Sequence, residues 1–278
     1  FILASLLILL LTVSCATSNT VNEVAAADTP AVETNEITVT TAEELAEAVK
    51  LKGKTVILAN DITMNSVLSG FGRKVVLDLG GNTLKFTCEE NNGIITSGGA
   101  SLTVKNGKVE AVKGFIKTND DTVLEDLEIH CVSYIPIVTN SASKFTMTNC
   151  KVVCDLSSSK NRAVIYGNNA AIGSTYTITN CELISATVVL YLNDYNAEDI
   201  PVTKWSSCTI TGCKFVSALP ECNSFMRSVK CTIDDTTVFE GSNILATNPD
   251  CTKKSQQKAP ASIEIRELKY SGGEYVAP

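Results

Sequence analysis

The chain of 278 residues carries a formal net charge of -7, and its lysines and arginines form no run in the sequence. A nucleic-acid surface or an anionic-membrane surface needs a basic patch, so this composition argues against both kinds of partner. Aromatic residues make up only 6% of the chain, whereas β-branched residues are frequent, which favours strands over helices.

The first residues of the chain, Phe1 to Val13, are almost wholly apolar. Such a run is too short to span a membrane but suits a signal peptide, so residues 1–15 are predicted to be an export signal that begins inside its apolar core. Leu11 to Cys15 resembles a bacterial lipoprotein box, with Thr12 where leucine is more usual. The resemblance implies that Cys15 is lipidated and anchors an exported protein in the cell envelope, at the outer membrane or cell surface. The alternatives are an ordinary cleaved signal and a cysteine placed there by chance.

Residues 16–36 are rich in Ala, Thr, Asn, Val and Glu without any periodicity, so we predict a flexible tether. Residues 37–278 are predicted to be a single domain. Thr41 and Glu44 form a capping-box pattern that predicts a short helix over residues 42–50. No second long apolar run follows, so nothing else is expected to span a membrane.

A repeat then replaces the helical period: apolar, any, apolar, any, Asn/Gly/Asp, small, any, apolar. Leu102 to Val109 fits this pattern. The alternation predicts strands whose apolar side chains face inward, and the Asn, Gly or Asp predicts a bend with left-handed backbone. Copies begin at residues 55, 77, 102, 122, 145, 176, 208, 231 and 263.

Self-similarity at this period is typical of a solenoid. We therefore predict an all-β fold, a right-handed parallel β-helix of about nine coils, in which equivalent residues stack about 4.8 Å apart. A leucine-rich horseshoe is rejected because the leucine spacing is wrong and the copies lack a helical half. An antiparallel sandwich is the rival, but it gives no reason for the turn residue to repeat in register.

Cysteines fall into columns in this register. Three interpretations are open: a metal site, which lacks any Cys-x-x-Cys pair; disulfides between coils; and soft apolar filling of the interior, which we favour for most columns. Cys222 and Cys251 lie in connections and are the favoured disulfide pair. One column stacks Cys150, Cys181, Cys213 and then Thr236 on successive coils. Two further columns place Cys208 next to Cys231 and Cys131 near Cys154 on neighbouring coils.

Outward threonines stack as well. Three Thr-x-Thr copies begin at Thr146, Thr177 and Thr209. A flat threonine array is typical of ice-binding β-helices, but the strand propensity of threonine explains three copies by itself, and we prefer that interpretation.

Three segments resemble the opening of pectate-lyase-like β-helix proteins: Thr38 to Leu45, Thr55 to Ile62 and Val76 to Leu84. The resemblance covers about residues 37–270 and is nearest to bacterial surface proteins and adhesins that carry this domain. It implies the fold and says little about function, because the fold carries many functions.

That family includes polysaccharide lyases and hydrolases. Asn119-Asp120-Asp121 is similar to the acidic part of a polygalacturonase site, but the Gly-His-Gly and Arg-x-Lys partners are missing, so we interpret these acids as turn residues. No acidic cluster with an arginine, as a Ca²⁺-dependent lyase needs, is evident. The single histidine, His130, is expected on an outward strand position without an orienting carboxylate. No catalytic residue and no metal ligand is therefore assigned.

The best candidate ligand site lies in a long connection and comprises Tyr191, Asn193, Asp194, Tyr195 and Trp205. Aromatic faces with polar edges suit sugar binding; no cofactor is assigned, although the carboxylates there could hold Ca²⁺. The alternative is a loop that packs its own aromatics against the coil. We predict a non-enzymatic, adhesin-like envelope lipoprotein that binds a glycan or a surface protein. A divergent polysaccharide lyase or glycosidase is one alternative, and a structural rod without a ligand is another.

Overall fold

A computed structural model describes residues 35–155, 163–168, 171–186, 188–192, 201–217, 224–226, 229–240, 245–247, 262–265 and 269–271. The predicted signal with Cys15, most of the tether, the pair Cys222 and Cys251, and the segment 193–195 lie outside these residues.

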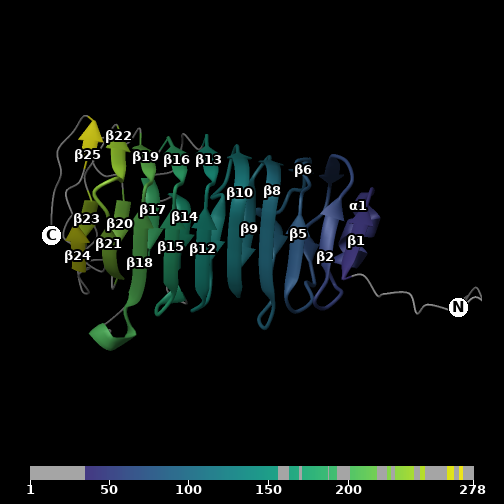
Figure 1. The fold of residues 1–278 in the computed structure, drawn as a ribbon, viewed down its shortest axis with the longest axis horizontal. Coiled ribbons are helices and arrows are strands. Elements are labelled where there is room, and N and C mark those ends of the chain that lie inside the picture. The colour runs from purple at the N-terminus through teal and green to yellow at the C-terminus, as the bar shows by residue number, and fades with distance from the viewer. Residues whose placement is uncertain are drawn as a thin grey trace, which may run out of the picture. The chain divides into compact units, whose positions relative to one another are not determined.

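The fold is an all-β, right-handed parallel β-helix of about eight turns, as the repeat predicts. Every pairing between strands is parallel, and in Figure 1 the repeat strands from β2 to β24 lie side by side in chain order. Nine successive repeat strands bound eight complete turns, so the predicted number of copies and the observed turns agree.

Each coil contributes two strand segments to a 17-stranded sheet, here sheet A, and one strand to an 8-stranded sheet, here sheet B. The first segments are β2 (Thr55–Leu58), β5 (Val75–Asp78), β12 (Lys144–Thr148), β15 (Thr175–Thr179), β18 (Ser206–Thr211), β21 (Val229–Ile233) and β24 (Ser262–Ile265). The second segments are β3 (Ile62–Met64), β6 (Thr83–Phe86), β13 (Lys151–Cys154), β16 (Glu182–Ser185), β19 (Lys214–Ser217), β22 (Val238–Glu240) and β25 (Lys269–Ser271). In β8 (Ser101–Ala111) and β10 (Asp121–Cys131) the two segments form one strand of 11 residues.

Sheet B was not predicted from the repeat. Its strands are β4 (Leu68–Ser69), β7 (Asn92–Ile95), β9 (Gly114–Thr118), β11 (Ile137–Thr139), β14 (Ala163–Gly167), β17 (Val188–Leu192), β20 (Ser224–Met226) and β23 (Leu245–Thr247). The alternation that reveals sheet A is absent here because several of these strands are buried at successive positions, as in β11 and β17. A strand buried on both faces has no period of two to detect.

A short helix closes the N-terminal end of the core. It is α1 (Ala42–Ala48), two residues shorter than predicted, and it follows β1 (Glu36–Val39), which pairs with β2. The Thr41 hydroxyl accepts the Glu44 N–H at 3.1 Å, as a capping box requires, but the Glu44 carboxylate accepts from Thr40 N at 2.7 Å. Leu45 is fully buried against the core. Among the described residues no helix is long and apolar enough to cross a membrane.

The predicted register of the first segments is confirmed from residue 102 onward and is wrong in the first two copies. Leu102 lies opposite Thr122, and the later repeat starts follow in line. In the second copy it is Val75, not Leu77, that lies opposite Leu102. In the first copy Val56 is buried and Thr55 is half-exposed, because the strand is shifted by one residue and a one-residue slip exchanges the two faces.

The predicted left-handed bends are confirmed in the five copies that begin at residues 102, 122, 145, 176 and 208, but not at Asp235 of the next copy. Asn106, Asp126, Asn149 and Asn180 have φ between 52° and 58° at this position, and Gly212 follows with φ 62°. The side chains also bond between coils: Asn149 Nδ2 donates to Asp126 Oδ1 at 3.0 Å, and Asn180 Nδ2 to Asn149 Oδ1 at 3.4 Å. This amide ladder fixes the corner of sheet A on successive coils.

The cysteine column at the next position completes the corner. Cys150 N–H donates to Cys181 Sγ and Cys181 N–H donates to Cys213 Sγ, both at 3.4 Å. Cys213 N–H then donates at 3.4 Å to Thr237 Oγ1, which corrects the predicted Thr236 by one residue. Val238 pairs with Lys214, so the bend before β22 contains one residue more than the repeat allows. The sulfurs of Cys181 and Cys213 are thus acceptors for buried backbone N–H groups.

Candidate functional site

The predicted ligand site is only partly described. Tyr191 lies in β17 with 6% of its surface exposed, and its ring stacks on Tyr166 at 5.6 Å between centroids and 20° between planes. Trp205 is half-buried and directly precedes β18. Asn193, Asp194 and Tyr195 lie outside the described residues, so the sugar-binding role of this connection stays a prediction. The Tyr191 ring is packed on a neighbour, so it offers little free face to a sugar.

A second surface emerges on the outer face of sheet A, which we call the outer strip. It lies where β8, β10 and β13 leave the corner, and alternation points every second side chain of these strands into solvent. Its residues are Asn106, Lys108, Glu110 and Val112, then Asp126, Glu128, His130 and Val132, then Asn149, Lys151, Val153 and Asp155.

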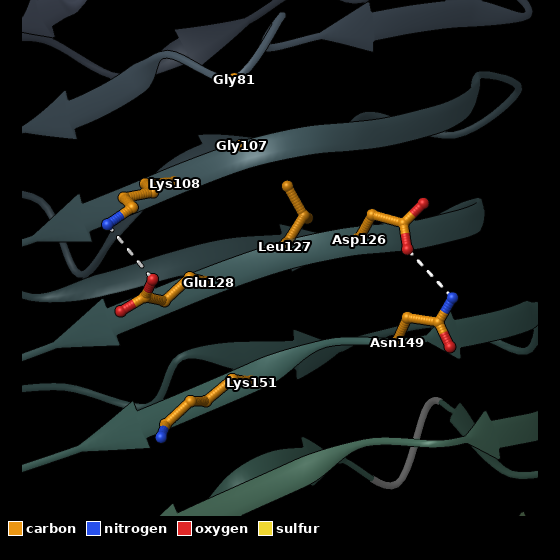
Figure 2. A pocket seen from close by; sticks show the side chains of 8 residues that line it. All are labelled: Gly81, Gly107, Lys108, Asp126, Leu127, Glu128, Asn149 and Lys151. Carbon is orange, nitrogen blue, oxygen red and sulfur yellow. Dashed lines mark hydrogen bonds and ion pairs between the residues drawn. The ribbon is translucent and has the colours of Figure 1, made fainter.

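The largest described hollow of the outer strip has a volume of about 430 Å³. Figure 2 shows that Lys108, Glu128 and Lys151 lie on one side of Leu127, whereas Asp126 and Asn149 lie on the other. Gly81 and Gly107 contribute backbone alone to the lining of this hollow. A Cβ on Gly107 would lie 2.6 Å from the Asn82 carbonyl oxygen and from Leu79 Cβ, so a side chain at position 107 would clash with the neighbouring coil.

The polar walls of this hollow are held by contacts between coils. Lys108 Nζ lies 3.3 Å from Glu128 Oε2 on one side, and the Asn149–Asp126 hydrogen bond spans the other at 3.0 Å. Because each wall joins two neighbouring strands of a hydrogen-bonded sheet, the backbone positions that carry its donors and acceptors are fixed relative to one another.

Two smaller hollows continue the outer strip along the strands. The first, of about 280 Å³, shares Lys108 and Glu128 with the large hollow and adds Glu110 and His130. The second, of about 140 Å³, is lined by His130, Glu110 and two half-exposed valines, Val112 and Val132. The strip is therefore one open path that runs from an amide corner to an apolar end.

His130 has a carboxylate partner, which overturns the prediction from sequence. Its Nε2 lies 2.6 Å from Asp155 Oδ2, and both side chains are about half exposed. His130 pairs with Val153 in the register, so Asp155, two residues further on, can reach back to the ring. The missed signal is the register itself, because the two residues are a full coil apart in sequence.

Charges alternate along the second segments of sheet A. Opposite one another on successive coils lie Lys108, Glu128, Lys151, Glu182 and Lys214. Lys151 lies 3.0 Å from Glu182, and Lys214 lies 2.9 Å from Glu240. Glu110 similarly lies 3.4 Å from Lys85. Exposed pairs of this kind stabilise a sheet by less than about 1 kcal/mol each, so their main effect is to balance charge and to orient side chains.

The two acids of the polygalacturonase-like segment serve the backbone, as the turn interpretation predicts. Asp120 Oδ1 accepts the N–H groups of Gly99 and Ala100 at 2.5 and 3.0 Å. Asp121 Oδ1 accepts the N–H of Lys144 at 2.8 Å. Both carboxylates bond to the neighbouring coil, which gives each a structural role.

The threonine columns are in register on the other half of sheet A. Thr146, Thr177, Thr209 and Thr232 lie opposite one another, so the first column is one coil longer than the three Thr-x-Thr copies. Thr148, Thr179 and Thr211 form the second column. The register is thus confirmed, and no role for this face follows from it.

Among the described residues no group of three or more His, Cys, Asp or Glu side chains is placed to hold a metal ion. Comparison with protein-family models found no match, and comparison with curated proteins found none either. The fold therefore defines the class, a parallel β-helix protein, and the likeness to pectate-lyase-like surface proteins stays a resemblance.

Proposed function

We propose that this protein is a non-enzymatic β-helix that binds a glycan in the outer strip. The observation that carries the proposal is the hollow over Gly81 and Gly107, open to solvent and walled by paired polar groups on both sides. Carboxylate, amide and ammonium groups fixed in this way can bond to the hydroxyls of a sugar ring, and the valines at the far end can contact its apolar edge.

The charge balance favours a neutral glycan over a polyanion. The carboxylates of Glu128 and Glu110 already face lysines, and Lys151 faces Glu182. A uronate or sulfate would have to displace one of these carboxylates from its lysine, whereas hydroxyl groups add to the pairs without removing them. The export signal and the Cys15 anchor belong to the proposal and would place the strip at the cell envelope.

The test is binding of neutral and anionic polysaccharides by calorimetry to the native chain and to Glu128→Gln. We expect neutral glycans to bind and the substitution to weaken binding at least tenfold, because it removes the charge-assisted acceptor of one wall. Lys214→Ala is the matched control: it removes a charge from the same ladder but outside the hollow, and it should bind as the native chain does. Equal loss in both variants, or no binding by the native chain, would contradict the proposal.

A divergent polysaccharide-cleaving enzyme is the second candidate, and the His130–Asp155 pair is the observation that favours it. A histidine oriented by a carboxylate is a common proton-transfer group, and Glu110 and Glu128 line the same small hollow. Incubation with a panel of polysaccharides, with and without a chelator, decides between the two. Release of reducing or unsaturated products that His130→Ala abolishes would establish the enzyme; intact polymers would leave binding as the function.

A further inference from the structure

Two pairs of cysteines face each other across neighbouring coils. Cys131 of β10 lies opposite Cys154 of β13, and Cys208 of β18 lies opposite Cys231 of β21. All four are free thiols inside the core, and none is more than 3% exposed. Neighbouring parallel strands lie about 4.7–4.9 Å apart, which is within the Cα separation of about 4.4–6.8 Å that disulfides accept.

The pairs differ from the cysteine column at the corner. There, the sulfurs of Cys181 and Cys213 accept backbone N–H groups for which the bend offers no carbonyl. Cys131 and Cys208 instead lie within strands whose backbone pairs with the next coil in the ordinary way. The ladder beside them therefore does not depend on their sulfurs as acceptors.

The sulfurs of each pair also interact. A hydrogen bond with Cys231, followed by burial, raises the pKa of Cys208 well above its usual value. Burial, followed by the neighbouring Cys154, does the same to the pKa of Cys131. Because the thiolate is the reacting form, Cys131 and Cys208 are unreactive once the coils have closed.

We propose that Cys131–Cys154 and Cys208–Cys231 are disulfide sites, oxidised while the chain folds in an oxidising compartment. One thiolate attacks an external disulfide, either glutathione disulfide or that of a protein oxidoreductase, and expels one thiolate from it. The partner thiolate then attacks the mixed disulfide and expels the second. The two cysteines lose two electrons and two protons, and the external disulfide becomes two thiols. Each bond ties one coil to the next and is then sealed from reductants by the core.

The test is peptide mapping of the native chain after export to a bacterial periplasm. Free thiols are blocked with N-ethylmaleimide in denaturant, and the unreduced protein is digested with trypsin and analysed by mass spectrometry. Cys131 is the only cysteine of the peptide 118–144, and Cys154 is the only one of the peptide 152–160, so their link is unambiguous. Cys150, alone in the peptide 145–151, is the internal control and should carry the blocking group.

We expect the 118–144 and 152–160 peptides to be joined until a reductant is added. Cys208 shares the peptide 205–214 with Cys213, and Cys231 shares the peptide 231–253 with Cys251, so fragmentation must place both ends of the link between Cys208 and Cys231. Blocked thiols at Cys131 and Cys154, or a link from either to Cys150, would overturn the proposal. The mapping uses the native sequence, so its result does not depend on a variant that folds.

Discussion

Replacing Cys181 tests whether the cysteine column holds the corner of sheet A. Its sulfur accepts the buried N–H of Cys150 at 3.4 Å and donates to the Thr179 carbonyl oxygen at 3.2 Å. The side chain is 2% exposed. Cys181→Ala removes the acceptor and leaves the N–H without a partner, whereas Cys181→Ser keeps an acceptor at the same place.

The expected magnitude follows from two contributions. A buried N–H without a partner costs about 1–3 kcal/mol. Loss of a sulfur-sized apolar group adds about 1 kcal/mol, by analogy with a buried methylene. The free energy of unfolding should therefore fall by about 2–4 kcal/mol in Cys181→Ala and by about 1 kcal/mol or less in Cys181→Ser. The small loss expected for Cys181→Ser is supported by Thr237, whose hydroxyl oxygen already accepts the backbone N–H of Cys213 at the equivalent place.

The assay is urea unfolding followed by the fluorescence of Trp205, the single tryptophan of the chain, which directly precedes β18. β18 pairs with β15, the strand that leads into Cys181, so the reporter lies on the neighbouring coil. Solenoid coils contact mainly their neighbours, so a nearby reporter follows the affected part of the chain. Equal loss of stability in the alanine and serine variants would refute this reasoning, because the hydrogen bond from the Cys150 N–H to the sulfur would then contribute nothing to the free energy of unfolding.

Three further predictions concern the stability of the same fold. The hydrogen bond with Cys150 raises the pKa of Cys181 from 9.0 to about 12, and burial raises that of Tyr176 to about 12. Both groups hold their proton more tightly in the folded state, so their contribution to the free energy of unfolding is complete below about pH 9 and is lost as the pH rises towards 12. The urea midpoint should therefore fall across this pH range. It should fall less steeply in Cys181→Ser, which lacks the thiol. Asn149→Ala should cost about 1.5–3 kcal/mol in urea unfolding, from its left-handed backbone and its bond to Asp126, and Asn149→Gly should restore only the backbone part. Gly93→Ala should lower the thermal midpoint with a loss of about 1–3 kcal/mol, because its Cβ would lie 2.3 Å from the Phe86 ring; an unchanged midpoint would show that the ring moves freely.

The fold was predictable because its signal is local and repeated. Alternation gave the strands of sheet A, and the Asn or Gly at the fifth position gave the left-handed bends at Asn106 and Asn149. The first copy failed because Thr55 is compatible with either face, and only pairing with the next coil fixes that Val56 turns inward. In the second copy Leu77 turns inward as predicted, and only its partner is wrong, because the strand is shifted by two residues.

The outer strip was not predictable in the same way. Its hollow is lined by two glycines from different coils, Gly81 and Gly107, and by walls made by residues a coil apart. His130 seemed isolated in sequence because its neighbours on β10 are Ile129 and Cys131, whereas Asp155 approaches from the following coil. The connections between coils differ in length, so the spacing in sequence does not reveal which side chains meet.

The sequence alone determined that this protein is a parallel β-helix, which side chains of sheet A face inward between residues 102 and 233, and where the left-handed bends of these coils lie. Those properties depend on period-two burial and on backbone preferences that each residue carries by itself. Only the tertiary structure decided that His130 meets Asp155, that cysteine sulfurs serve the corner amides, and that a polar hollow opens over two glycines. Those properties depend on contacts between side chains of different coils, and residues far apart in the sequence meet only when the coils stack.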